Sequence, residues 1–289
     1  MYQNYLIVSS IEEAIKVLQN DAARVIAGGT DLMIAMKEGE TEYNTFVDIT
    51  QIPQLRKIYI SDNKLIIGAS ATFYDIEVNG LICQHVPSLS QAAAQVGSPQ
   101  IRNVATLGGN IVNAMPAADG ATALFALSAE IEIMGTNGTK IMPIADCYKG
   151  IGQSAINSEQ EVVTAIVIPL DKVGKNIYKR FALRKSLALP VVAAAAALKV
   201  ENHKIKNARM VLSPAGKMPW IAQEMTKELQ GMPLEKRILL DAASKAAATA
   251  PFRDSPVRCS AAYKRQLAGT LLRDAVMDLY EAWLTEEAI

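Results

Sequence analysis

Two pairs of adjacent glycines are the residues whose type and spacing point most directly to chemistry. One pair lies in "RVIAGGTDL" (24–32) and the other in "ATLGGNIVN" (105–113), and each separates a strand pattern from a helix pattern. Because glycine has no side chain, a ligand can approach its backbone closely, and unpaired N–H groups at the start of a helix attract anions. A tight turn is the ordinary explanation for one such pair. Two pairs in one domain favour a cradle for a phosphate or a diphosphate.

The residues that follow the second pair add polar groups to this stretch. Asn110 can donate and accept hydrogen bonds. Asp119 could cap a helix that begins at Gly120, which is its simplest interpretation. The established phosphate and nucleophile motifs G-x-x-x-x-G-K-[ST] and G-x-S-x-G do not occur. "GIGQSA" (150–155) fits G-x-G-x-x-A, but no buried strand precedes it and no helix follows, so we interpret it as a loop.

The cysteines and histidines do not form a metal-binding pattern. Cys83, Cys147 and Cys259 are scattered and lack C-x-x-C spacing, and His85 is far from His203. His203 lies in "ENHK" (201–204), which is typical of a hairpin turn. We therefore expect no metal bound by this chain.

Length and composition narrow the class of protein. The chain has 289 residues, enough for two domains, with 29 basic and 29 acidic residues and a formal net charge of zero. Balanced charge gives no indication of binding to nucleic acid or to an anionic membrane. The N-terminus lacks a signal-peptide pattern, and the apolar run 187–200 is too short to span a bilayer and contains Pro190. We expect a soluble, cytoplasmic protein.

Periodicity divides the chain into a mixed first part and a second part with strands before helices. In the first part we predict strands at 23–27, 45–49, 64–70, 129–135 and 161–169, and helices at 11–20, 30–39, 72–80 and 87–97. A polar link at 170–176 is the best candidate for a domain boundary. Beyond it we predict strands at 177–185, 191–200 and 205–213, then helices that end with a long one at about 261–287. The fold class is α+β.

The two glycine motifs, in this order and spacing, resemble those of the FAD-binding (medium) subunits of the molybdenum hydroxylase family. "AGGTDL" (27–32) is similar to the first flavin motif of that family, and "IRNVATLGGNIVNAMPAAD" (101–119) to the second. "RFALRKSLALPVVAAA" (180–195) and "SPVRCSAAYKRQLAGTLLRDAV" (255–276) extend the resemblance over nearly the whole chain. It is closest to the separate flavin subunits of bacterial xanthine dehydrogenases.

The resemblance implies a fold and a division into domains. Residues 1–172 would form an FAD-binding domain of the vanillyl-alcohol-oxidase or PCMH type, with two α+β lobes around the cofactor. Residues 173–289 would form an α+β domain of the CO dehydrogenase flavoprotein C-terminal type.

The resemblance also implies which residues bind FAD. The first motif would wrap the diphosphate and the second would form another clamp, while Asp119 and Val163 would contact the cofactor. Arg180 lies where the family commonly has a lysine near the flavin ring, and the neighbouring Lys179 leaves the register open. The complete implied set is Val25, Ile26, Ala27, Gly28, Gly29, Thr30, Asp31, Leu32, Ile101, Ala105, Thr106, Leu107, Gly108, Gly109, Asn110, Asp119, Val163 and Arg180.

By the same resemblance, the chain is an electron-transfer subunit of an oxidoreductase. It would receive electrons from [2Fe–2S] clusters on a small partner subunit, while a large partner subunit holds molybdopterin and oxidises the substrate. FAD would pass the electrons to NAD⁺ or another acceptor, so we predict no catalytic acid or base in this chain. Two alternatives remain open at this point: a free-standing FAD-dependent oxidase or dehydrogenase, and a scaffold subunit that has lost FAD.

Overall fold

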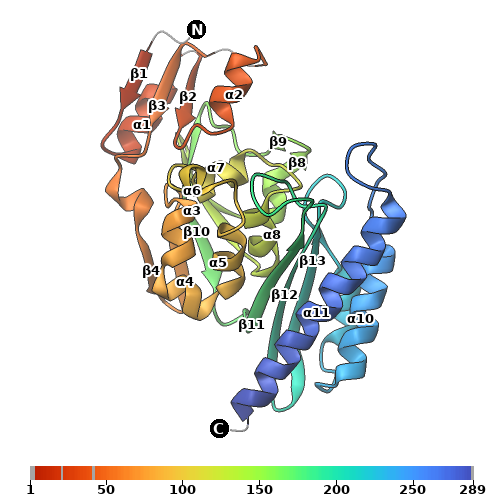
Figure 1. Cartoon of the computed structure of the whole chain (residues 1–289). Coiled ribbons are helices and arrows are strands. Elements are labelled where there is room, and N and C mark those ends of the chain that lie inside the picture. Colours follow the sequence, from red (N-terminus) through yellow and green to blue (C-terminus); the bar gives the residue numbers. More distant parts are fainter. Residues whose placement is uncertain (1–3, 21, 41–42, 288–289) are drawn as a thin grey trace.

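A computed structural model describes residues 4–20, 22–40 and 43–287 and contains two lobes followed by a C-terminal sheet with its helices (Figure 1). In the first lobe, β1 (Asn4–Ile7), β3 (Thr45–Asp48) and β2 (Ala23–Ile26) form a parallel sheet in that order. Helices α1 (Ile11–Leu18) and α2 (Leu32–Lys37) join these strands. The hydroxyl of Ser10 accepts a hydrogen bond from the Glu13 N–H and caps the start of α1.

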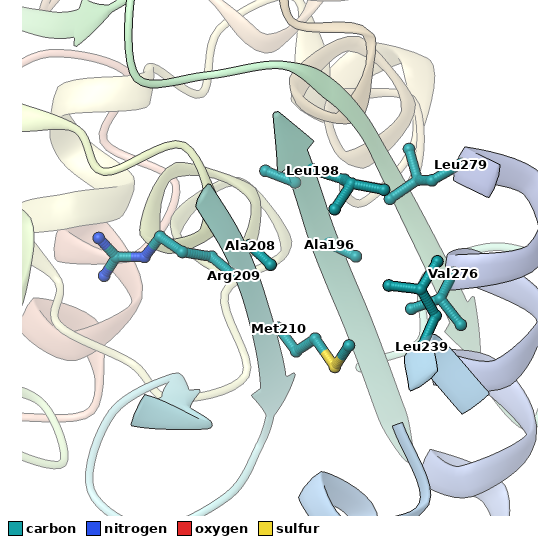
Figure 2. Close-up of a pocket in the computed structure, with 9 residues that line it drawn as sticks. Ala196, Leu198, Ala208, Arg209, Met210, Leu239, Val276 and Leu279 are labelled. Atoms are coloured by element: carbon teal, nitrogen blue, oxygen red, sulfur yellow. The ribbon is translucent and has the colours of Figure 1, made fainter. Parts of the chain in front are cut away.

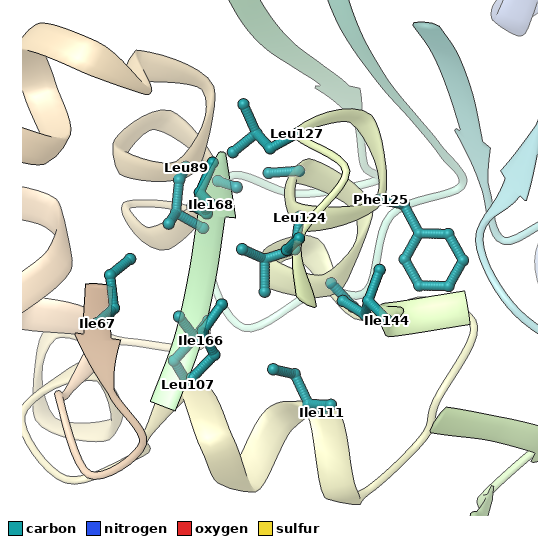
Figure 3. Packing of buried hydrophobic residues seen from close by; sticks show 14 of the residues in the cluster. Ile67, Leu89, Leu107, Ile111, Leu124, Phe125, Leu127, Ile144, Ile166 and Ile168 are labelled. Atoms are coloured by element: carbon teal, nitrogen blue, oxygen red, sulfur yellow. The ribbon is translucent and has the colours of Figure 1, made fainter. Parts of the chain in front are cut away.

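The second lobe is built on a five-stranded antiparallel sheet. Its order is β4 (Ile58–Ser61), β5 (Lys64–Gly68), β10 (Glu161–Pro169), β6 (Glu130–Gly135) and β7 (Gly138–Pro143). Short helices connect these strands: α3 (Phe73–Val78), α4 (Gly80–His85), α5 (Pro87–Ala93), α6 (Pro99–Arg102), α7 (Leu107–Val112) and α8 (Asp119–Ala126). Two 3₁₀ turns (Pro53–Arg56 and Ile144–Cys147) and the hairpin of β8 (Tyr148–Gly150) and β9 (Gln153–Ser154) complete the lobe. Side chains of β10 and of α5, α7 and α8 interlock in its core (Figure 3).

The C-terminal part is a four-stranded antiparallel sheet covered by helices. The strands are β11 (Lys175–Phe181), β12 (Val192–Glu201), β13 (Lys204–Ser213) and β14 (Trp220–Ile221), in that order. Helices α9 (Gln223–Leu229), α10 (Lys236–Thr249) and α11 (Ala261–Glu287) follow. The predicted turn at "ENHK" joins β12 to β13, with Asn202 and His203 at positive φ. One expected strand is shorter than predicted, because β11 ends at Phe181 and residues 182–190 form a loop.

The position of β12 between two layers of helices explains the alanine-rich run 193–197. The sheet lies between α5 and α8 of the second lobe on one side and α10 and α11 on the other (Figure 1). Ala193 and Ala195 belong to the core of the second lobe, whereas Ala194 and Ala196 belong to the core under α10 and α11. A strand buried on both faces needs apolar residues at every position, and alanines allow helices to approach closely from both sides. In the part of the chain that the structure describes, no helix has the length and apolarity to cross a bilayer.

A void of about 10 Å³ remains between this sheet and α10 and α11. Leu198 and Met210 of the sheet face Leu239, Val276 and Leu279 of the helices there (Figure 2). The void is about the size of one water molecule and is lined by apolar side chains, so it is a packing defect and not a ligand site.

Candidate cofactor-binding site

A cavity of about 820 Å³ lies where the two glycine motifs meet. This volume is in the upper part of the range of about 300–1,000 Å³ that small-molecule sites occupy. Its walls come from the segment after β2, from α6 and α7, from the β8–β9 hairpin and the loop after it, and from the loop that follows β11. Segments distant in sequence therefore contribute to one site.

The first motif supplies donors that have no partner among the residues that the structure describes. Between the end of β2 and the first turn of α2, no hydrogen bond within residues 4–20, 22–40 and 43–287 uses the N–H groups of residues 27–30. Gly28 must be glycine because a Cβ atom would lie 2.1 Å from the Val104 carbonyl oxygen, and Gly29 has φ of +66°. Val104 belongs to the second motif (101–119), so the first motif packs directly against the second. The unpaired N–H groups are suited to an anion such as a diphosphate.

The second motif is fixed to the end of β5 by its own N–H groups. Leu107 donates to the Ala71 carbonyl at 3.0 Å, and Gly108 donates to the Ala69 carbonyl at 2.9 Å. A Cβ atom on Gly108 would lie 2.7 Å from the Ala69 carbonyl oxygen, whereas one on Gly109 would meet only the Thr106 hydroxyl, at 3.0 Å. Both glycines line the cavity, and the expectation that they give a ligand access to the backbone stays a prediction. Gly108 permits packing against Ala69, and Gly109 is the glycine with open space beside it.

Asn110 carries a buried polar atom without a partner. Its Oδ1 makes no hydrogen bond with any residue that the structure describes, although Asn110 lines the cavity. The Thr106 hydroxyl accepts from the Gly109 N–H at 3.2 Å and keeps its own proton available. A ligand with hydroxyl groups and phosphates would pair with both side chains.

Asp119 does not cap a helix, contrary to its simplest interpretation. It is the first residue of α8 and makes no capping hydrogen bond. Its carboxylate instead accepts hydrogen bonds from the Tyr178 hydroxyl and, at 3.0 Å, from the Arg180 guanidinium. Burial raises the pKa of Asp119 to about 6, although Arg180 and Tyr178 act in the opposite direction. Burial and the Asp119 charge raise the pKa of Tyr178 well above its ordinary value, so Tyr178 remains a donor.

Alternation along β11 places Arg180 and Lys179 on opposite faces of the sheet. Asn176, Tyr178 and Arg180 face the first domain, where Asn176 bonds to Ser88 and His85. Lys179 faces the other way and pairs with Asp278 of α11 at 2.5 Å. Arg180 is therefore the basic residue of β11 on the cavity side of the sheet.

The structure brings the residues of the implied set to this one cavity, except Leu107 and Arg180. Leu107 is fully buried in the core beside Ile166 (Figure 3). Its N–H group donates to the Ala71 carbonyl, so Leu107 does not reach the cavity. Arg180 lies behind the wall, bonded to Asp119 and to the carbonyls of Gln95 and Ala188.

Sequence reasoning missed parts of the wall. Gly97, Leu187 and Leu189 line the cavity, as do Gly152 and Ser154 of the "GIGQSA" stretch. That stretch forms the β8–β9 hairpin where we expected a plain loop. No periodicity identifies such residues, because their proximity to the glycine motifs depends on long-range packing.

The comparisons with known proteins identify the family. Residues 1–171 match the family model described as "FAD binding domain in molybdopterin dehydrogenase", and residues 176–279 match the "CO dehydrogenase flavoprotein C-terminal domain". The chain belongs to the family of FAD-binding subunits of molybdenum hydroxylases. The predicted family and fold class are thereby confirmed.

Individual relatives cover most of this FAD-binding chain. It is 29% identical over 285 residues to the "Xanthine dehydrogenase FAD-binding subunit" of Escherichia coli O157:H7, which covers 97% of both chains. It is 34% identical to the "Nicotinate dehydrogenase FAD-subunit" of Eubacterium barkeri, over 73% of this chain and 72% of that one. The structure of reconstituted CO dehydrogenase from Oligotropha carboxidovorans superimposes with a TM-score of 0.86 at 30% identity, over 96% of each chain.

The residues of the cavity fit FAD. Unpaired N–H groups in the first motif suit the diphosphate, the unpaired Asn110 oxygen suits a hydroxyl donor, and the apolar Val25, Ile101 and Leu187 suit a flat ring system. Among the described lining residues, Arg24 is the only basic side chain, so backbone donors would carry most of the interaction with the phosphates. The described residues contain no group of three or more His, Cys, Asp or Glu side chains that could hold a metal ion.

Proposed function

We propose that this chain is the electron-transfer subunit of a molybdenum-containing dehydrogenase. In this proposal a small partner subunit with [2Fe–2S] clusters delivers electrons, and a large molybdopterin subunit oxidises the substrate. FAD passes the electrons to NAD⁺ or another acceptor, and the complex is cytoplasmic. Relatives named as FAD-binding subunits of xanthine and nicotinate dehydrogenases support an oxidoreductase role. The observation that carries the proposal is the row of unpaired N–H groups at residues 27–30 beside the unpaired Asn110 oxygen in one large cavity.

The residues of this chain would bind and orient the cofactor. The N–H groups of residues 27–30 would hold the diphosphate, and Thr106 and Asn110 would pair with the phosphates or the ribityl chain. Val25 and Val163 would contact it from strands, and Asp119 would bond to a polar part of it. Bound FAD supplies the redox chemistry, which can proceed in one-electron and two-electron steps. This chemistry requires no acid or base from the protein.

We further propose that the domain boundary lies between residues 172 and 173. Strand β10 ends at Pro169 and completes the sheet of the second lobe, whereas β11 begins at Lys175 and starts a separate sheet. The family matches leave residues 172–175 between them.

The direct test is to purify the chain alone, record its visible spectrum and identify any acid-released cofactor by mass spectrometry. NADH is then added anaerobically, and candidate substrates are added separately. We expect released FAD, a flavin that NADH bleaches, and no oxidation of a heterocyclic substrate by the chain alone. A well-folded chain that takes up no FAD would support a scaffold, and substrate oxidation without partners would support a free-standing flavoenzyme.

A further inference from the structure

Arg180 connects three segments at the edge of the cavity. Its guanidinium donates to the Gln95 carbonyl and to Asp119, both at 3.0 Å, and to the Ala188 carbonyl. The side chain is 8% exposed, so these bonds are largely shielded from water. None of the three partners is on the same segment as another.

Asp119 and Ala188 line the cavity themselves, and Gln95 adjoins residues that line it. Gln95 precedes Val96 and Gly97, and Ala188 lies between Leu187 and Leu189. The two segments also contact each other directly, because the Leu187 N–H donates to the Gly97 carbonyl at 3.3 Å. The wall segments 96–97 and 187–189 thus share one anchor, which does not itself line the cavity.

We propose that Arg180 is a positioning residue that holds the wall 187–189 closed over the cofactor and keeps Asp119 in place, instead of a direct FAD ligand. The inference rests on the proposed FAD binding. Nη1 of the guanidinium donates to the Gln95 carbonyl and to Asp119, and Nη2 donates to the Ala188 carbonyl, so the three bonds start from two nitrogens of one planar group, whereas a lysine ammonium has one nitrogen. A lysine in its place would keep the charge but not all three bonds.

The test compares FAD release from the full chain in four forms: wild type, Arg180→Met, Arg180→Lys and Lys179→Met. Release is followed by the rise in flavin fluorescence after dilution. We expect Arg180→Met to release FAD roughly tenfold faster or more, the scale of one lost charge-assisted hydrogen bond, and Arg180→Lys to fall between it and the wild type. Lys179→Met is the matched control, because Lys179 lies on the opposite face of β11 and should leave release unchanged.

Limited trypsin digestion of the chain without FAD separates positioning from direct contact. Arg184 and Lys185 are exposed in the loop that Arg180 anchors. We expect faster cleavage there in Arg180→Met, whereas a residue that acted only as an FAD ligand would leave cleavage without FAD unchanged. The inference would be overturned if Arg180→Met were cleaved, or released FAD, at the wild-type rate. Release of FAD at the wild-type rate from Arg180→Lys would also overturn it.

If Arg180→Met does not fold, the same tests are made with Arg180→Lys. A wild-type chain that takes up no FAD refutes the proposed function itself.

Discussion

At the scale of single residues, glycines that look equivalent in sequence have different roles. Gly28 and Gly108 allow two backbone segments to touch, because a Cβ atom on either would clash with a carbonyl oxygen. Gly29 permits a positive φ, and Gly109 leaves space beside the chain. The first two roles concern folding, and the last concerns a ligand.

Substitutions at the second pair should separate these roles. We expect Gly109→Leu to abolish FAD retention while changing the melting temperature little, because the only close neighbour of its Cβ is the Thr106 hydroxyl. Gly108→Leu should instead destabilise the fold by about 1–3 kcal/mol or more through overpacking against Ala69. Flavin absorbance and thermal unfolding of both variants provide the measurement. Normal flavin content in Gly109→Leu would refute the assignment of this motif.

Asp119 should make the stability of the chain without FAD depend on pH. The pKa of Asp119 is about 6 in the folded chain and 3.8 ordinarily. Between about pH 4 and pH 6, Asp119 therefore keeps its proton in the folded chain and has lost it in the unfolded chain. The contribution of Asp119 to the free energy of unfolding is therefore greatest below about pH 4 and decreases as pH rises through about 6. Urea unfolding across this range should show the decrease in the wild type and a flatter profile in Asp119→Asn. A wild-type profile that rises relative to Asp119→Asn would contradict the raised pKa.

At the scale of secondary structure elements, β11 connects the two domains. One of its faces bonds to α4, α5 and α8 of the first domain, and the other contacts α11. On the first face, Asn176 forms hydrogen bonds through both the oxygen and the nitrogen of its side-chain amide. Its Oδ1 accepts from the Ser88 N–H at 2.9 Å, and its Nδ2 donates to the His85 carbonyl at 3.2 Å.

Removing this side chain should weaken the interface. Asn176→Ala leaves a buried N–H group and a carbonyl without partners, so we expect the free energy of unfolding to fall by about 1–3 kcal/mol. Asn207→Ala is the matched control: Asn207 donates one hydrogen bond to the Lys172 carbonyl in an exposed position, and its loss should cost about 0.5 kcal/mol or less. Denaturant unfolding measures both values. Equal effects would show that burial of the Asn176 bonds does not matter.

The elements themselves were largely predictable, because strand alternation, helix spacing and caps such as Ser10 are local properties of the sequence. The glycine motifs were also visible, and the family resemblance indicated FAD as their ligand. The loop 182–190 was not predictable: its sequence continues the pattern of β11, and only its bonds to Gly97 and Arg180 make it part of the cavity wall. The face on which Arg180 lies depends on the register between β11 and β12. A one-residue error in that register would place Arg180 on the opposite face.

At the scale of the whole molecule, the hydrophobic core crosses the domain boundary. Tyr178, Ala193, Ala195 and Val211 from the C-terminal sheet belong to the same buried cluster as α5 and α8. The two domains therefore share apolar surface that neither could bury alone.

We accordingly expect cooperative unfolding of the whole chain. Differential scanning calorimetry should give a single transition with equal calorimetric and van't Hoff enthalpies. Saturation with FAD should raise the temperature of that transition without splitting it, because a ligand that binds only the folded state stabilises everything that unfolds with its site. Two separate transitions would indicate that the interface through β11 and β12 contributes little.

The composition of the cavity from distant segments has a consequence for biogenesis. A ribosome makes the chain from its N-terminus, and the cavity needs residues 24–35, 96–119, 152–163 and finally 187–189. The donors at residues 27–30 leave the ribosome long before the segment that covers them. A nascent chain therefore cannot enclose an occupant during most of its synthesis, and full enclosure becomes possible only after the loop after β11 has emerged and folded back over the first domain.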